Sequence, residues 1–398
     1  MLQRFHIVTL VLFLFAITPC PRTAADEPLI KVDFDSPEAD ALIRKGFTRK
    51  DEDGKPLDSG GVERALVIRK GQWEAPSVPV EPFGYYRIRC QTKVAETCFV
   101  SVTFFNKEDK PHAADVYDLL DASADWHSYE SCVRGRVDSI RMRLRFHVAG
   151  SPLSVDDIQV EEISSSDVAD WADELASRNP VMRYRPPRNR CSLLPNTMKR
   201  LRDGGRLRVV ILGDSICNDT SNSTFEALLQ RVYPQAHVEV VTSVRGSTGC
   251  SYYRDQGRVE QYVLRFKPAF VIIGGISHDF DVEAIRAVIR QIRANSDCEI
   301  MVMSGPVTPL ETIERFAYQR HRGPRAELLR RMELFPDALR NMTHDEKIEH
   351  LDMRTAWDEY MLRSYRPQDW FMRDIIHANN RGKQVLGRIL ARYFEPKP

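Results

Sequence analysis

After residue 206 the sequence alternates short apolar runs with longer stretches in which apolar residues recur every three to four positions. Runs typical of buried strands lie at residues 208–212, 237–241, 269–273, 299–303 and 348–353. Stretches with the period of amphipathic helices lie at residues 225–232, 282–292 and 385–393. Strands that alternate with such helices form a parallel sheet covered on both faces, and ligands bind at the carboxyl ends of its strands. The sequence therefore predicts an α/β region over residues 206–396.

The first of these strands runs into a turn that carries a serine. The strand is followed directly by Gly213, Asp214 and Ser215. Gly213 is expected to allow a sharp turn with positive φ, and the next helix is expected to be capped by Asn222 or Ser223. A serine in this place is presented at the carboxyl edge of the sheet, beside backbone N–H groups. Ser215 is therefore a candidate nucleophile, although an inert turn fits these three residues equally well.

A base for such a serine is found about 160 residues later. Asp374 and His377 stand three residues apart just before the last helix. A serine hydroxyl becomes a nucleophile when a base takes its proton, and the base needs a group that orients it. On one turn, the Asp374 carboxylate can hold one ring nitrogen of His377 while the other faces Ser215. Cys217 is a second candidate nucleophile, but its position in the turn favours buried packing.

Residues 206–396 resemble the SGNH hydrolases, also called the GDSL family of esterases and lipases. The first block of that family corresponds to residues 213–216, Gly-Asp-Ser-Ile, and the last to Asp374 and His377, followed by Asn379 and Gly382. The second block corresponds to Gly249 in the stretch 243–249. The resemblance implies a three-layer α/β/α flavodoxin-like fold, a triad of Ser215, His377 and Asp374, and oxyanion donors at the N–H groups of Ser215 and Gly249.

The third block departs from the family, which has Gly-x-Asn-Asp after its third strand. Here residues 274–279 read Gly-Gly-Ile-Ser-His-Asp, so the asparagine that would give a third oxyanion donor is absent. Ser277 or His278 can supply a side-chain donor instead. Ser277 is favoured, because with Gly275 it keeps the spacing of the family block. Asn218, Asp219 and Arg245 lie near these residues in sequence and are expected to order the pocket.

The first part of the chain has a different period. Residues 27–163 contain many short runs in which apolar and polar residues alternate, as in 140–146, which is typical of an antiparallel β-sandwich. The opening run 32–35 and the closing run 153–160 resemble those of jelly-roll carbohydrate-binding modules with a galactose-binding-like fold. Aromatic residues that can either stack on sugar rings or pack in the core are Trp73, Trp126, Tyr85 and Tyr117.

Three further segments have simple interpretations. Residues 1–25 read as a secretory signal that is cleaved after Ala25, which predicts a secreted or periplasmic protein, and no integral membrane segment is expected in the mature chain. Residues 164–205 read as a solvated linker with a short helix capped by Ser164 and Asp167. Residues 309–345 read as a helical insertion, either a lid or a cover.

Charge and cysteine content limit the partners of the chain. The 57 basic and 56 acidic residues nearly cancel, which argues against nucleic acid as a partner. Seven cysteines remain after the signal, an odd number without the spacing of a zinc site, and no metal or cofactor is expected. Pairing of Cys90 with Cys98, or of Cys217 with Cys250, remains open at this point.

The predicted function is that of a secreted serine esterase, which hydrolyses carboxylic esters through an acyl-enzyme. The expected substrate carries short acyl groups on carbohydrate, such as acetylated polysaccharide. One alternative is an O-acyltransferase that uses the same triad. Another is a carbohydrate-binding surface protein whose hydrolase domain has lost its activity.

Overall fold

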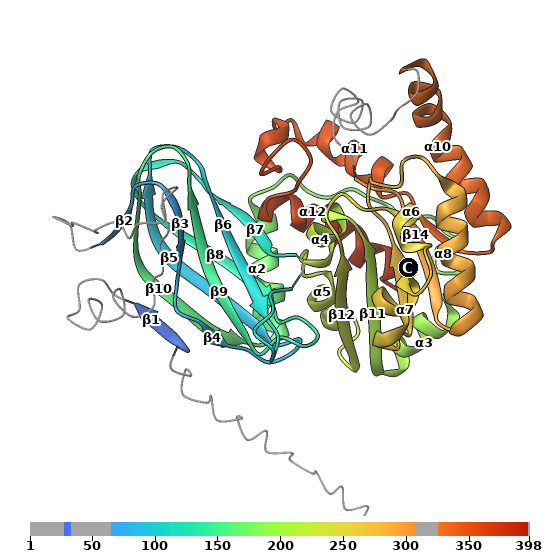
Figure 1. The fold of residues 1–398 in the computed structure, drawn as a ribbon, viewed down its shortest axis with the longest axis horizontal. Helices are drawn as coiled ribbons and strands as arrows, with labels where there is room; N and C mark the ends of the chain where they lie inside the picture. The colour runs from blue at the N-terminus through green and yellow to red at the C-terminus, as the bar shows by residue number, and fades with distance from the viewer. Residues whose placement is uncertain (1–27, 33–64, 113, 307–324, 397–398) are drawn as a thin grey trace, which may run out of the picture.

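The computed structural model describes residues 28–32, 65–112, 114–306 and 325–396. These residues form an antiparallel β-sandwich and a parallel α/β region that lie side by side (Figure 1). The signal segment 1–25 lies outside the described residues, and so does the part of the 309–345 insertion before residue 325. The predicted fold class, an α/β fold preceded by a β-sandwich, is confirmed.

The sandwich consists of two sheets, each with five strands among the described residues. In the first sheet, β10 pairs with β1, β2 and β5, and β5 pairs with β8; the strands are β1 (Ile30–Val32), β2 (Leu66–Ile68), β5 (Tyr85–Val94), β8 (Ser123–Arg134) and β10 (Leu153–Ile163). In the second, β9 pairs with β3, β4 and β6, and β6 pairs with β7; the strands are β3 (Gly71–Glu74), β4 (Val78–Pro79), β6 (Cys98–Phe105), β7 (Val116–Leu120) and β9 (Arg141–Val148). Alternate residues of β9 are buried, as its period predicts, although Ile140 lies before the strand and is exposed.

The α/β region is built on one parallel sheet of strand order β12-β11-β13-β14-β15. Its strands are β11 (Gly205–Gly213), β12 (Ala236–Val244), β13 (Phe270–Ile273), β14 (Glu299–Met303) and β15 (Glu349–Leu351). Counted in chain order, this is the 2-1-3-4-5 arrangement of flavodoxin-like folds. The order places the first strand, β11, between β12 and β13, and at its carboxyl end the chain continues into Asp214 and Ser215.

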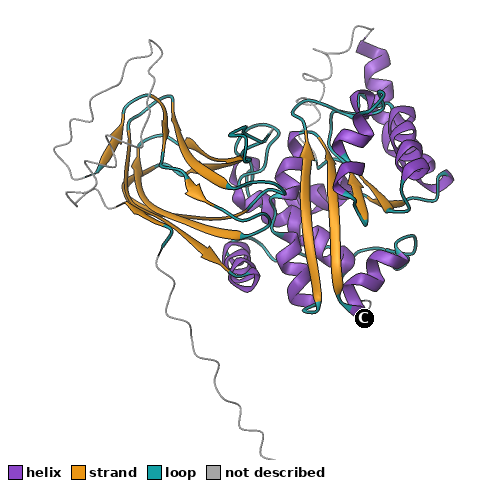
Figure 2. Cartoon of the chain, turned by 60° about the horizontal axis from the view of Figure 1, so that its bottom comes forward, coloured by secondary structure: helices purple, strands orange, loops and turns teal. Residues whose placement is uncertain are grey.

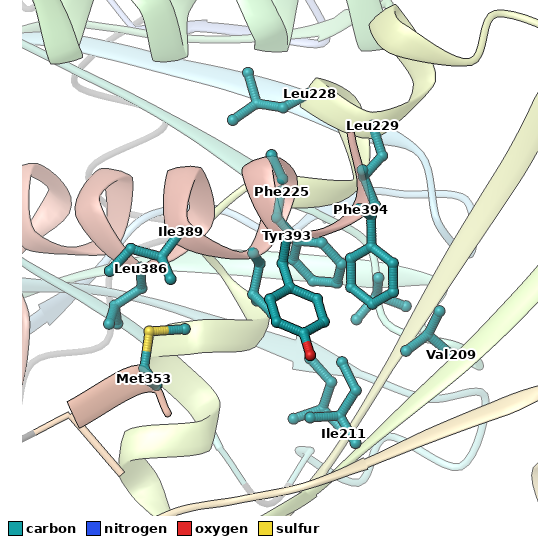
Figure 3. Packing of buried hydrophobic residues seen from close by; sticks show 14 of the residues in the cluster. Val209, Ile211, Phe225, Leu228, Leu229, Met353, Leu386, Ile389, Tyr393 and Phe394 are labelled. Carbon is teal, nitrogen blue, oxygen red and sulfur yellow. The ribbon is translucent and has the colours of Figure 1, made fainter. Parts of the chain in front are cut away.

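Helices cover both faces of this sheet (Figure 2). Val209 and Ile211 of β11 pack under α5 (Phe225–Val232) and α12 (Asn380–Phe394), as Figure 3 shows. Val210 and Leu212 point to the opposite face and pack under α8 (Val282–Asn295). The other helices are α2 (Ser165–Ser177), α3 (Pro195–Asp203), α4 (Ser215–Ser221), α6 (Cys250–Tyr253), α7 (Arg258–Tyr262), α10 (Arg325–Asp345) and α11 (Met353–Ser364), with 3₁₀ turns η1 (Leu264–Phe266) and η2 (Gln368–Trp370).

Residues 164–205 are not a separate linker. The predicted capping box is present, because the Ser164 hydroxyl accepts from the Asp167 N–H and the Asp167 carboxylate accepts from the Ser164 N–H. However, Val168 and Trp171 of α2, together with Leu194, join the apolar core of the α/β region. The apolar face of α2 is buried there against α5 and α12. In the stretch 183–190, which was predicted to be solvated, the arginines at 183, 185 and 188 are exposed, whereas Arg190 is buried.

The aromatic residues considered for sugar stacking have different environments. Trp73 is 4% exposed and packs on Phe146 in the sandwich core, which excludes it from a surface platform. Tyr85 packs against the core of the α/β region, and Tyr117 faces an arginine of that region, whereas Trp126 is 43% exposed. Only Trp126 of the four remains open to a sugar ring.

Two further expectations are settled by the fold. Cys90, Cys98, Cys217 and Cys250 are buried free thiols, so neither suggested disulfide is formed. Within the ranges that the structure describes, no helix has both the length and the apolar character needed to cross a membrane.

Candidate active site

Ser215 is held at the point where β11 passes into a helix. Asp214 caps this helix, α4, since its Oδ1 accepts hydrogen bonds from the N–H groups of Ile216 at 2.9 Å and Cys217 at 3.4 Å. This helix begins at Ser215 itself and was not predicted, whereas the predicted helix 225–232 is present as α5. The predicted cap at Asn222 or Ser223 is wrong, because the next helix follows Thr224, whose φ of 58° is left-handed.

Glycine is needed at position 213 for a reason other than the predicted one. Its φ is not among the positive values of the chain. Instead, a Cβ at this position would lie 2.4 Å from the Gly274 carbonyl oxygen and 2.6 Å from the Cys217 sulfur. The absence of a side chain therefore lets β11 approach the loop that follows β13.

The structure brings Ser215, His377 and Asp374 together. The Ser215 Oγ lies 2.8 Å from Nε2 of His377, and Nδ1 of His377 lies 2.8 Å from Oδ2 of Asp374. Ser215 and His377 are separated by 162 residues in sequence. They meet because β11 ends at the same edge of the sheet as the loop that precedes α12. This order of hydroxyl, imidazole and carboxylate is what general-base activation of a serine requires.

The surroundings of Asp374 stabilise the charged form of its carboxylate beside the imidazole. Its Oδ1 also accepts hydrogen bonds from the N–H groups of Ile376 at 2.9 Å and His377 at 2.8 Å. Burial opposes the charge, but the hydrogen bonds from the His377 ring and from these N–H groups outweigh it and lower the pKa of Asp374 to about 2. The carboxylate can thus orient the ring and stabilise the imidazolium that forms when the ring takes a proton.

The predicted oxyanion residues Gly249 and Ser277 are neighbours. A Cβ at position 249 would lie 2.0 Å from the Ser277 carbonyl oxygen, so only glycine fits against this loop. The loop is fixed by Asp214, whose Oδ2 accepts from the N–H groups of Ile276 and Ser277, each at 2.7 Å. Asp214 therefore links the serine turn to the segment that replaces the third family block, a role that the sequence did not reveal.

His278 has a different role from the predicted one. Its Nδ1 accepts from the Cys250 N–H at 3.2 Å, so its Nε2–H donates to the Gly274 carbonyl oxygen at 3.0 Å. Burial lowers the pKa of His278, which favours this neutral form. Both ring nitrogens are occupied, so the ring has no N–H left for an oxyanion. It instead ties the turn after Gly249 to the end of β13.

Three other residues near the site can now be assessed. Cys217 is completely buried, and burial raises the pKa of its thiol well above the ordinary value, so it is a packing residue. Arg245 lies over the ring of Tyr252, with 5.0 Å between its guanidinium carbon and the ring centroid. Asp219 pairs with Arg373, which no sequence pattern marked as a site residue. Within the described ranges, no group of three or more histidine, cysteine, aspartate or glutamate side chains has the arrangement of a metal site.

No protein-family model matches this sequence, and no curated protein matches it. Three similar solved structures are proteins that act on esters or carry the G-D-S-L name. A two-domain esterase active on acetylated mannans, CEX, is 15% identical with a TM-score of 0.39 over 52% of this chain and 55% of its own. A family two carbohydrate esterase from Cellvibrio japonicus is 12% identical with a TM-score of 0.28 over 83% and 90%.

The third is a putative lipolytic protein of the G-D-S-L family from Desulfitobacterium hafniense DCB-2, 17% identical with a TM-score of 0.31 over 47% of this chain and 98% of its own. The present chain spans about half the length of the mannan esterase. These TM-scores are all below 0.5, so the similarities do not decide what this chain does.

Proposed function

We propose that this protein is a serine esterase of the SGNH type, which hydrolyses carboxylic esters through an acyl-enzyme intermediate. The observation that carries the proposal is the hydrogen-bonded series from Ser215 to His377 and Asp374, with 2.8 Å at each of its two contacts. A hydrolase domain that had lost its activity would have no need to keep three side chains from distant segments in this geometry.

The proposed reaction follows from the positions of these groups. Ser215 Oγ attacks the ester carbonyl carbon while Nε2 of His377 takes the hydroxyl proton, and the Asp374 carboxylate stabilises the imidazolium. The imidazolium then returns the proton to the leaving alcohol as the carbon–oxygen bond breaks. A water molecule, deprotonated by His377, attacks the acyl-enzyme and releases the acid and free Ser215.

The negative charge on the tetrahedral intermediate needs donors that are in place before it forms. We assign this role to the N–H groups of Ser215 and Gly249, as in the family that the sequence resembles, with the Ser277 hydroxyl as the third donor. The backbone of Ser277 lies against Gly249, which places the two residues side by side, and the bonds of His278 argue against a direct role for its ring.

A short acyl group on carbohydrate is the proposed substrate. A small cavity of about 10 Å³ is lined by Ile216 and Ile376, the neighbours of Ser215 and His377 in sequence, and also by Asp219. A space of this size holds about one water molecule or methyl group, so it offers no room for a long acyl chain. The carbohydrate part rests on the β-sandwich, whose sequence resembles carbohydrate-binding modules. Secretion after cleavage at Ala25 is part of the same proposal.

The nucleophile is tested by Ser215→Ala, assayed with p-nitrophenyl acetate. We expect turnover to fall at least about a thousandfold, since removal of the nucleophile abolishes the covalent pathway. The melting temperature should change little, because the variant keeps the backbone of α4. The wild-type rate should also fall at acid pH, since a protonated imidazole cannot accept the serine proton.

A matched control is Ser177→Ala, which removes an exposed hydroxyl at the end of α2 and should leave turnover unchanged. Near-wild-type activity of Ser215→Ala would exclude Ser215 as the nucleophile. A wild-type rate that does not fall at acid pH would argue against a histidine base.

A further inference from the structure

Asp219 connects the helix that carries Ser215 to the loop that carries His377. It lies four residues after Ser215 on α4, and its side chain is 1% exposed. Its Oδ1 accepts from Nη1 of Arg373 at 2.7 Å, and its Oδ2 accepts from the N–H of Ala378 at 2.9 Å. Since Arg373 and Ala378 flank the segment 374–377, this single carboxylate holds both ends of the loop that bears the base.

The same loop is closed on itself by Arg373. The Arg373 N–H donates to the His377 carbonyl oxygen at 2.8 Å, and Nη1 of Arg373 donates to the Ala378 carbonyl oxygen at 2.5 Å. Met372 and Ala378 form an isolated β-bridge at its base. The hydrogen-bond partners of the His377 ring are Ser215 and Asp374. The position of the ring therefore depends on the backbone that Arg373 and Asp219 fix.

The β-sandwich contacts Arg373 and also residues of α4 and α12. The ring of Tyr117, on β7, lies against the Arg373 guanidinium, with 5.5 Å between the guanidinium carbon and the ring centroid. The Tyr117 carbonyl oxygen accepts from Nζ of Lys383 on α12 at 2.5 Å. Beside it, Asn218 of α4 donates to the Asp115 carbonyl oxygen at 2.7 Å. The loop of His377 is thus held between α4 and the sandwich.

We propose that Asp219 and Arg373 are positioning residues for His377, and that Tyr117 of the sandwich holds the Arg373 guanidinium in place. The proposal rests on the proposed esterase function. The Arg373 guanidinium meets both acceptors through one nitrogen, because Nη1 donates to the Asp219 carboxylate and to the Ala378 carbonyl oxygen. A displacement of a reacting group by about 1 Å can lower turnover by about a hundredfold, so a small movement of the loop has a large effect.

The main test is the double variant Asp219→Asn with Arg373→Met, which removes the ion pair without leaving a lone buried charge. We expect kcat for p-nitrophenyl acetate to fall by roughly 10- to 100-fold, with KM changed less than about threefold, because the contact acts on the reacting geometry. The single variant Arg373→Lys, which keeps a positive charge beside Asp219, should lose less kcat than the double variant. The matched control, Arg286→Met with Glu346→Gln, removes a partly buried pair between α8 and the end of α10, and should keep wild-type kcat.

Labelling with a fluorophosphonate separates this proposal from the proposed function. If the wild type neither hydrolyses esters nor is labelled at Ser215, the proposed function fails. If the wild type is labelled and the double variant is labelled at the same rate, the positioning role is excluded. A melting temperature that falls while kcat of the folded protein is unchanged would also exclude it.

A second pair of variants covers the case in which the double variant does not fold. Tyr117→Ala keeps the ion pair and removes only the ring that lies against Arg373, and Tyr117→Phe restores this ring. We expect the labelling rate of Ser215 to fall several-fold in Tyr117→Ala and to recover in Tyr117→Phe. Equal labelling rates in the wild type and Tyr117→Ala would overturn the part assigned to the sandwich.

Discussion

The β-sandwich and the α/β region each have an apolar core, and where they meet, apolar contacts of Tyr85 and Cys132 stand beside buried polar groups. The sandwich core is formed by alternate residues of its own strands, and the α/β cores lie on the two faces of the parallel sheet. At the junction, Arg134 of β8 forms an ion pair with Glu226 of α5, and the two side chains are 4% and 0% exposed. Arg136 donates to Asn222 at 3.1 Å and to Thr242 at 2.6 Å.

Apolar contacts and buried polar contacts differ in how well they tolerate a shift of one region against the other. Apolar surfaces tolerate small shifts, whereas a buried charge is stable only when its partners are in place. We infer that the junction fixes the orientation of the sandwich on the α/β region, at the cost of burying charged groups. The groups so fixed include α4 and the loop of His377, so the orientation matters to the site.

The largest effect is expected from separating the two regions. We propose that residues 27–163 fold on their own, because their core needs no residue from the α/β sheet. The fragment 164–398 should lose at least about a hundredfold in turnover of p-nitrophenyl acetate, since α4 and Arg373 lose their outer support. Circular dichroism and thermal unfolding test the first expectation, and hydrolysis tests the second.

Mixing the two fragments provides the control for this experiment, because reassembly of the junction should restore part of the activity. If the sandwich fragment lacks a cooperative transition, its fold depends on the junction. If the fragment 164–398 is fully active, the junction has no influence on the site.

A smaller effect is expected from breaking a single junction pair. Arg134→Met leaves the Glu226 carboxylate buried without its partner, and we expect the free energy of unfolding to fall by about 3–5 kcal/mol. Urea unfolding measures this change. Arg231→Met removes an arginine that pairs with the exposed carboxylates of Asp170 and Asp173, and should cost about 0–1 kcal/mol. Equal losses in the two variants would mean that the junction stabilises no more than a surface pair.

The sequence predicted the regions and the main elements, because their apolar residues have clear periods. It also predicted that Ser215, Asp374 and His377 lie together, since the carboxyl ends of parallel strands share one edge. The helix α4 was missed because its residues 218–221 are polar although buried, which leaves no apolar repeat. Arg134 and Arg136 were missed for a related reason. A polar strand face looks the same in sequence whether water or a polar partner covers it.

The smallest effect is expected at Lys383, whose amine is buried against the sandwich. It is 2% exposed and donates to the Tyr117 carbonyl oxygen and to Oδ1 of Asn380. Burial lowers its pKa to about 8 from an ordinary value of 10.5, although Asp118 and Asp219 favour the charged form. Arg373 and Arg136, which also face the amine, act in the same direction as burial.

The consequence for stability has a definite sign. Between about pH 8 and 10.5 the unfolded chain binds more protons at Lys383 than the folded chain does, so this residue makes the free energy of unfolding rise with pH in that window. Below about pH 8 the amine is charged in both states and its contribution is constant. Buried cysteines and tyrosines also titrate at high pH, but they do so in the wild type and in Lys383→Met alike. The difference between the two proteins, measured by urea unfolding at pH 7 and pH 10, should therefore move by about 1 kcal/mol or more in favour of the wild type. If the difference in the free energy of unfolding between the two proteins is constant with pH, the amine is solvated. The sandwich then does not exclude water from this part of the junction.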